Sequence, residues 1–129
     1  MSHSARQTIR HLFTYGTLRP GHSRWSQLAG FADPFQPPRP ATVRGELWLT
    51  PYGWPALTCG TDKVTGMLVT LTEESLAAAL SLLDVIEGVN QGLFRRDLTL
   101  CLPHSRCWVY RWPGATDGFV RAPITALLH

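Results

Sequence analysis

Only one stretch of this 129-residue chain has the spacing of a long helix, and this limits the folds that the chain can adopt. Between Thr72 and Gly88, in a run rich in alanine and leucine, Leu76, Leu80 and Leu83 recur on one helical face. Elsewhere ten prolines and eleven glycines divide the chain into short alternating segments, which are typical of β-strands.

These alternating segments predict the strands of the fold. They are residues 12–15, 42–50, 54–57, 63–71, 93–102 and 106–112. We expect Leu49 to share a buried face with Val43 and Leu47, and Leu98 and Leu100 to belong to the apolar set of their strand. Residues 54–57 are expected to form a short edge strand, because Pro55 cannot donate to a ladder. Strands that outnumber helices in this way predict an α+β fold, a small, mostly antiparallel β-barrel with one main α-helix.

The length predicts one domain at residues 9–129, after a flexible N-terminal tail at residues 1–8. No apolar run approaches the roughly 20 residues that cross a bilayer, and the first ten residues lack the apolar core of a signal peptide. We therefore expect a cytoplasmic protein without a membrane partner. The sequence leaves its oligomeric state open.

Charge and cysteine usage exclude several classes of site. The net charge is +3, but the arginines are scattered and only Arg95 and Arg96 are adjacent, so no nucleic-acid partner is expected. Cys59, Cys101 and Cys107 form no Cys-x-x-Cys pair, which indicates reduced thiols rather than disulfides. The histidines do not lie at the spacing of a zinc site around any cysteine, and no phosphate-binding loop is present. We therefore expect no metal and no cofactor.

The first candidate for a binding site follows the first predicted strand, in the stretch from Tyr15 to Gly21. Gly16 has no Cβ, so the main chain can approach a ligand closely there. The N–H groups of Gly16, Thr17 and Leu18 can then form a concavity for a carboxylate or an oxyanion. A plain turn after a strand has the same residues, and this reading stays open.

The second candidate is Glu87, a carboxylate at the end of the leucine stripe of the predicted helix. If Glu87 is buried there, desolvation raises its pKa toward the range of a proton shuttle. The alternative is a helix that frays after Leu83 and leaves Glu87 in water. Asp84 is the rival carboxylate, and we expect it to bond to nearby backbone.

Both stretches resemble signatures of one family. Residues 15–21, and residues 83–88 followed by Phe94-Arg95-Arg96, are similar to the two motifs of the gamma-glutamylcyclotransferase-like family, of the AIG2-like or gamma-glutamylamine cyclotransferase type. Residues 43–47, 52–57, 64–66 and 108–110 resemble its intervening segments in the same order. Phe94 departs from the pattern, because it stands where the family usually has tyrosine.

The resemblance implies an enzyme that cyclises a gamma-glutamyl amide or amine to 5-oxoproline and releases the free amine, with Glu87 as the general acid/base. Tyr15 and Tyr110 are candidate pocket walls or hydroxyl donors, although packing in the core would explain them equally well. The residues expected to bind the small-molecule substrate are Tyr15, Gly16, Thr17, Leu18 and Tyr110.

Two other functions remain open at this point. A small-molecule-binding or interaction domain would keep the same barrel without turnover, and only a buried Glu87 would distinguish the enzyme from it. A nucleic-acid-binding barrel is the weaker alternative. The gamma-glutamyl compound is also open: dipeptides, gamma-glutamyl amines and a protected biosynthetic intermediate all fit the resemblance.

Overall fold

The computed structural model describes residues 8–102 and 105–122. Most of the predicted tail at residues 1–8 lies outside these ranges. The predicted strands at 93–102 and 106–112 imply a hairpin loop at 103–105, and its first two residues also lie outside them. The elements in chain order are β1 (His11–Thr14), α1 (Trp25–Ala29), β2 (Arg39–Leu49), β3 (Pro55–Thr70), α2 (Leu76–Ile86), the 3-10 turn η2 (Val89–Gln91), β4 (Arg95–Leu102), β5 (Ser105–Arg111) and β6 (Val120–Arg121).

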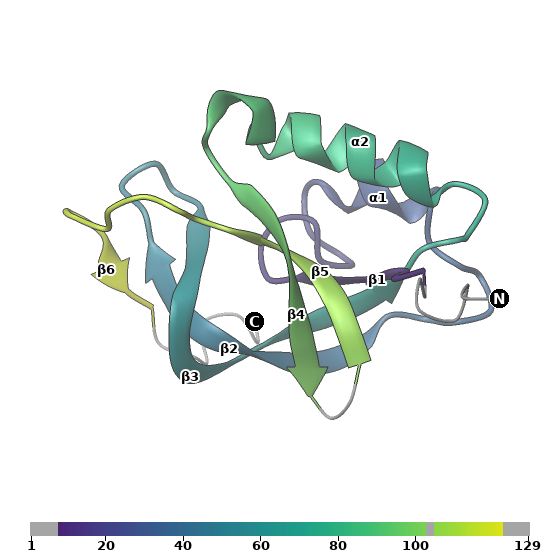
Figure 1. The fold of residues 1–129 in the computed structure, drawn as a ribbon, viewed down its shortest axis with the longest axis horizontal. Helices are drawn as coiled ribbons and strands as arrows, with labels where there is room; N and C mark the ends of the chain where they lie inside the picture. Colours follow the sequence, from purple (N-terminus) through teal and green to yellow (C-terminus); the bar gives the residue numbers. More distant parts are fainter. Residues whose placement is uncertain (1–7, 103–104, 123–129) are drawn as a thin grey trace, which may run out of the picture.

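Five strands close into a barrel, in the order β3, β1, β5, β4, β2 and back to β3 (Figure 1). The short β6 adds to the outer end of β2. All neighbours are antiparallel except β1 and β5, which pair in parallel through Leu12 and Trp108. The predicted small, mostly antiparallel barrel with one main helix is confirmed.

The strand alternation separates two apolar cores. Side chains such as Phe13, Val43 and Val109 fill the barrel, and their alternates, such as Leu12 and Val69, lie outside it in a second cluster with the helices. Both helices cover the same side of the barrel, with α1 beneath α2 (Figure 1). The short strand β1 is therefore covered on both faces, and its last three residues, Leu12, Phe13 and Thr14, are buried.

The helix α2 is shorter at its start than predicted. It begins at Leu76 rather than at Thr72, because the Thr72 hydroxyl bonds to the Ser75 hydroxyl and caps no helical N–H group. At the other end Gly88 adopts a left-handed conformation with φ of +67°, which ends the helix where the sequence predicts.

The segments predicted as an edge strand at 54–57 and a separate strand at 63–71 are one continuous strand. β3 runs over 16 residues and pairs with β2 along most of its length. Pro55 is tolerated because it is the first residue of β3, opposite Leu49. Leu49 itself is 44% exposed, so its predicted burial is wrong. Leu49 is the last residue of β2, and the alternation that buries Val43 and Leu47 ends before it. The bulge of this ladder lies in β3, where the pairing passes from Asp62 opposite Gly45 to Thr58 opposite Glu46.

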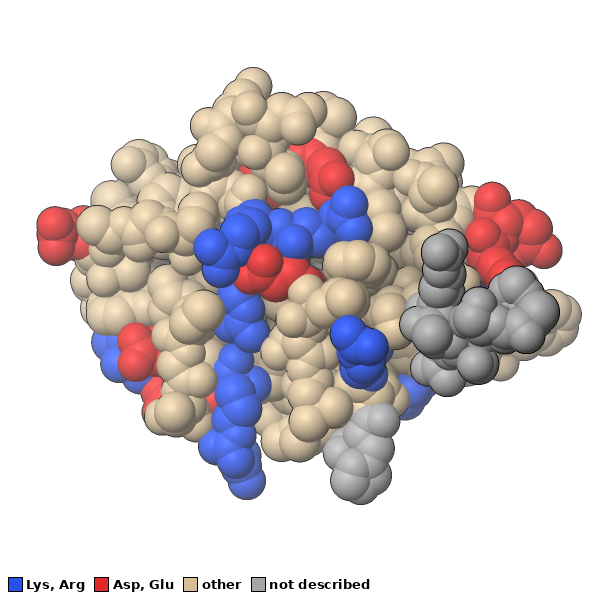
Figure 2. All heavy atoms as spheres, viewed as in Figure 1, with Lys and Arg blue, Asp and Glu red and all other residues tan. Residues whose placement is uncertain are grey.

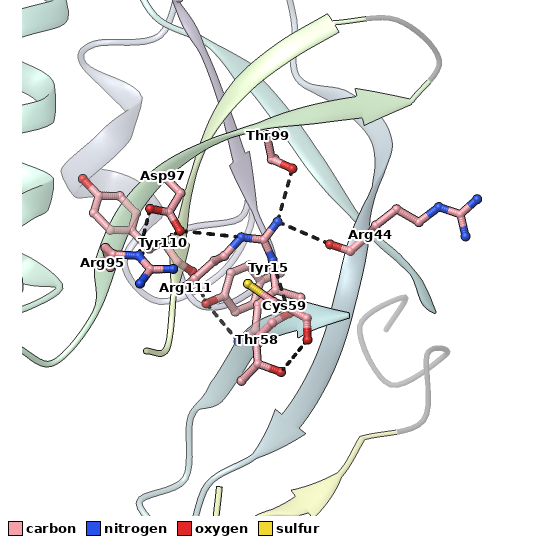
Figure 3. A network of polar contacts seen from close by, with 10 residues as sticks. Tyr15, Arg44, Thr58, Cys59, Arg95, Asp97, Thr99, Tyr110 and Arg111 are labelled. Atoms are coloured by element: carbon pink, nitrogen blue, oxygen red, sulfur yellow. Dashed lines mark hydrogen bonds and ion pairs between the residues drawn. The ribbon is translucent and has the colours of Figure 1, made fainter. Parts of the chain in front are cut away.

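The strand β4 turns its leucines outward. Leu98 and Leu100 are 41% and 54% exposed, while the buried Arg111 of β5 reaches the alternate residues of β4. Its guanidinium donates to the Thr99 hydroxyl at 3.2 Å and lies 3.8 Å from the Asp97 carboxylate (Figure 3). This part of the barrel interior is polar. The prediction that placed Leu98 and Leu100 on the buried face of β4 is therefore wrong.

Basic and acidic side chains lie against one another on the face viewed in Figure 2. On β4, Arg95 pairs with Asp97 at 2.9 Å, and Arg96 pairs with Asp84 at 2.8 Å. The adjacent arginines are thus neutralised by neighbours. Within the described ranges, no helix is long and apolar enough to cross a membrane.

The contact between Gly66 and β1 predicts a stability effect. A Cβ at Gly66 would lie 2.7 Å from Cζ of Phe13, so Gly66→Ala must push the two strands apart. We expect a loss of about 2–3 kcal/mol in the free energy of unfolding, measured in urea. Gly30→Ala is the matched control, because no atom lies within 4 Å of its Cβ position. Its stability should be unchanged or raised by up to about 1 kcal/mol, and equal effects at both sites would contradict the packing described here.

Candidate active site

A cavity of about 350 Å³ lies between the end of β1, the end of α2 and the start of β3. This volume is in the lower range of small-molecule sites, roughly 300–1,000 Å³. Residues predicted from two distant parts of the sequence meet there, and all of them line the cavity: Tyr15, Gly16, Thr17, Leu18, Glu87 and Tyr110.

Glu87 stands at the end of the helix and its side chain is largely enclosed. The Glu87 N–H donates to the Leu83 carbonyl oxygen at 2.8 Å, so the last turn is intact and does not fray. Gly88 reverses the chain immediately afterwards. Only 13% of the Glu87 side chain is exposed, and its carboxylate lines the cavity rather than the outer surface.

Burial raises the pKa of Glu87, because the cavity hydrates a carboxylate poorly. The guanidinium of Arg24, with Nη2 at 3.9 Å from Oε1, acts in the opposite direction and lowers that pKa. Desolvation is the larger effect. Across residues 8–102 and 105–122, no hydrogen bond to the Glu87 carboxylate is present, so its oxygens are available to a ligand.

The loop after β1 lines the same cavity and contains backbone donors that the described residues leave unused. In the described part of the chain, the N–H groups of Gly16, Thr17 and Leu18 donate no hydrogen bond. The carbonyl side of the loop is fixed instead, since Arg19 N–H donates to Gly16 at 3.1 Å and Arg24 N–H to Thr17 at 2.9 Å. Three consecutive free donors can hold an anion.

Arg24 is the residue that sequence reasoning missed. Its Nε donates to the Thr17 hydroxyl at 2.7 Å, its Nη2 approaches Glu87, and it lines the cavity. Arg24 thus connects the donor loop to the carboxylate. One arginine beside a short helix has no distinctive pattern, and only the packing of α1 against the loop reveals its place.

The two tyrosines line the cavity as walls, because their hydroxyls donate to groups within the protein and not to the cavity. Tyr15 donates to the Tyr110 carbonyl oxygen at 2.6 Å and accepts from Leu57 N–H at 3.3 Å (Figure 3). The Tyr110 hydroxyl donates to Asp84 at 2.8 Å. Burial raises the pKa of both hydroxyls, with a further contribution from nearby carboxylates, so both remain protonated.

Asp84 has a different role from the one predicted. It accepts from Nε and Nη2 of Arg96, at 2.8 and 3.2 Å, and from Tyr110, rather than bonding to nearby backbone. Asp84 does not line the cavity. The two carboxylates at the end of α2 therefore have different surroundings. Asp84 is paired with Arg96, and Glu87 lines the cavity.

The chain matches the family described as "Gamma-glutamyl cyclotransferase, AIG2-like" over residues 12–124. It belongs to this family. An AIG2-like protein from Mus musculus has a similar structure, with 19% identity, a TM-score of 0.65, and coverage of 87% of this chain and 83% of that one. An uncharacterized protein from Pyrococcus horikoshii has 18% identity and a TM-score of 0.65, over 89% of this chain and 86% of that one. A comparison with curated proteins gave no match.

At these identities the solved structures show that the AIG2-like fold is shared. The departure at Phe94 now has a place in this fold. Phe94 is 6% exposed, lines the cavity, and lies against Trp54 with ring centroids 5.5 Å apart. A hydroxyl on this ring is absent, and the wall is apolar there.

The raised pKa of Glu87 predicts a pH-dependent gain from its removal. Because the folded pKa lies above the unfolded one, burial of Glu87 costs nothing below the unfolded pKa and destabilises the protein as pH rises through the folded pKa. Glu87→Gln should therefore be more stable than the wild type at pH 7 and lose this advantage near pH 4, measured by urea unfolding at each pH. Asp84→Asn is the matched control, which breaks the contacts to Arg96 and Tyr110 and should be less stable at pH 7 by about 1–3 kcal/mol. A Glu87→Gln variant less stable than the wild type at pH 7 would contradict the cost assigned to the buried carboxylate.

Proposed function

We propose that this chain is an enzyme that cyclises a gamma-glutamyl amide or amine to 5-oxoproline and releases the free amine. The observation that carries the proposal is Glu87, an enclosed carboxylate with a raised pKa and free oxygens, in one cavity with three unused backbone donors. Family membership supports the same reaction class. A binding domain without chemistry would not need such a carboxylate, which costs stability at neutral pH.

The gamma-glutamyl end of the substrate has charges that complement this cavity. Its alpha-carboxylate or its gamma-carbonyl oxygen can accept from the N–H groups of Gly16, Thr17 and Leu18, and Arg24 supplies positive charge beside them. Its alpha-ammonium group is then directed toward Glu87. Holding the chain folded in this way brings the amine and the gamma-carbon together, which is the main requirement for an intramolecular attack.

The reaction balances with one proton carrier. Glu87 removes a proton from the alpha-ammonium, and the free amine attacks the gamma-carbonyl carbon to close a five-membered ring. The negative charge formed on the carbonyl oxygen is stabilised by backbone donors, each worth about 3 kcal/mol in a preorganised site. The carbon–nitrogen bond to the leaving group then breaks, and protonated Glu87 gives its proton to the departing nitrogen. The ring nitrogen carries two hydrogens after the attack, and it loses one of them through Glu87 to the released amine. The amine leaves as an ammonium ion, and the ring becomes neutral 5-oxoproline.

The substrate supplies the nucleophile, so the mechanism requires no serine, cysteine, metal or cofactor. We place the reaction in the cytoplasm, where the free thiols of Cys59, Cys101 and Cys107 stay reduced.

The direct test is release of 5-oxoproline from a panel of gamma-glutamyl amides and dipeptides by wild type and Glu87→Gln. The glutamine keeps the size of the side chain and cannot take the proton, so kcat/KM should fall by about 10²–10⁴-fold. Asp84→Asn is the control for loss of a carboxylate on the same helix, and its pH–rate profile should keep the acidic limb. A Glu87→Gln variant as active as the wild type would exclude the proposed role.

The contact between Arg24 and Glu87 predicts a shift in pH dependence. Arg24→Gln removes the cation that lowers the pKa of Glu87, so that pKa should rise further. The base acts deprotonated, and the acidic limb of the kcat/KM profile should therefore move to higher pH. Loss of the charge beside the donor loop should also raise KM about tenfold. The exposed Arg106, replaced by glutamine, is the control; a downward shift of the limb in Arg24→Gln would contradict the pairing.

A further inference from the structure

Aromatic side chains form one wall of the cavity and continue to the protein surface. Trp54 and Phe94 both line the cavity and are tilted by 53° to each other. Trp112 lies against both of them, with centroid distances of 5.9 and 5.7 Å, and Phe119 follows at 5.5 Å. Tyr52 stacks on Trp54 at 5.3 Å and is 66% exposed, so the row of rings reaches solvent.

This aromatic wall begins immediately beside Glu87. The next residue, Gly88, accepts a hydrogen bond from Leu93 N–H at 3.0 Å, which returns the chain to the cavity. Leu93 and Phe94 then line it, as does Ile86 before the carboxylate. A group released next to Glu87 therefore meets apolar side chains on leaving the reacting centre.

The cavity has few charges to offer such a group. Glu87 and Arg24 are the charged side chains among the described lining residues. Arg24 is already committed to Thr17 and Glu87. A second carboxylate, on the amine side of a substrate, would be enclosed against the aromatic wall without a partner, which is costly.

These observations define a second subsite, and the inference rests on the proposed function. We propose that the wall formed by Trp54, Leu93 and Phe94 binds the leaving amine, and that this amine is apolar and uncharged apart from its reacting nitrogen. An aromatic ring fits this wall best, because it can pack against Trp54 and Phe94 in the tilted geometry that aromatic groups favour. The substrate class is then a gamma-glutamyl arylalkylamide rather than a gamma-glutamyl amino acid.

The test separates binding from turnover. Calorimetry with Glu87→Gln, which should bind without reacting, is carried out with gamma-glutamyl benzylamide, gamma-glutamyl ethylamide and gamma-glutamylalanine. We expect the Kd of the benzylamide to be at least about tenfold lower than that of the ethylamide, with gamma-glutamylalanine weakest. Equal affinities, a preference for gamma-glutamylalanine, or no binding of the benzylamide would overturn the subsite. If the wild type releases no 5-oxoproline, the same titration is made on it, so failure of the proposed reaction is distinguished from failure of the subsite.

Two variants locate the preference. Trp54→Ala should raise the Kd of the benzylamide about tenfold and leave that of the ethylamide within about twofold. Leu93→Lys adds a cation at a half-exposed position of the wall, so the affinity for gamma-glutamylalanine should rise relative to the benzylamide. Leu100→Lys is the matched control, since Leu100 is exposed on β4 and outside the cavity. If Leu93→Lys leaves the ratio of the two affinities, for gamma-glutamylalanine and for the benzylamide, as it is in the parent protein, the assignment of this wall to the amine is overturned.

Discussion

The structure depends on closure of the barrel between β1 and β5. The parallel ladder there is short, with Leu12 and Trp108 as paired residues, and the Tyr15 hydroxyl reinforces it by joining the Tyr110 carbonyl to the Leu57 N–H. This one side chain holds three strands together just where the chain leaves β1. The donor loop begins at the next residue, and so the closure of the barrel and the shape of the cavity have a common origin.

The two carboxylates of α2 show how environment divides similar residues. Asp84 is fixed by a guanidinium and a phenol, and Glu87, three residues later, has the Arg24 guanidinium at 3.9 Å as its ion-pair partner within the described residues. Enclosure raises the pKa of Glu87. The left-handed Gly88 ends the helix at this point and prevents a further turn from covering Glu87. The end of the helix thus provides a paired carboxylate at Asp84 and a carboxylate that lines the cavity at Glu87.

The sequence predicted the barrel, the helix and the residues that meet in the cavity, because hydrophobic periodicity and glycine placement act locally. Three features could not be obtained in this way. The inward face of β4 is recognised only with Arg111, which comes from another strand and makes a polar interior favourable. The single long β3 continues through a bulge of its own, opposite Gly45 and Glu46 of β2, and this pairing is a tertiary feature. The place of Arg24 depends on tertiary packing, and burial of Glu87 likewise required the surrounding elements.

The pairing of Leu12 with Trp108 also has a consequence for the order of folding. These residues are separated by almost the whole barrel sequence, and contacts of such separation form late because the loop between them must first be ordered. Leu12 and Tyr110 belong to the same outer core as the helices, while Phe13 and Val109 belong to the interior. During synthesis, β1 can pair with β3 before it pairs with β5, because β5 leaves the ribosome later. The cavity is therefore completed in a late step, because Tyr110 of β5 lines it and is synthesised after Glu87.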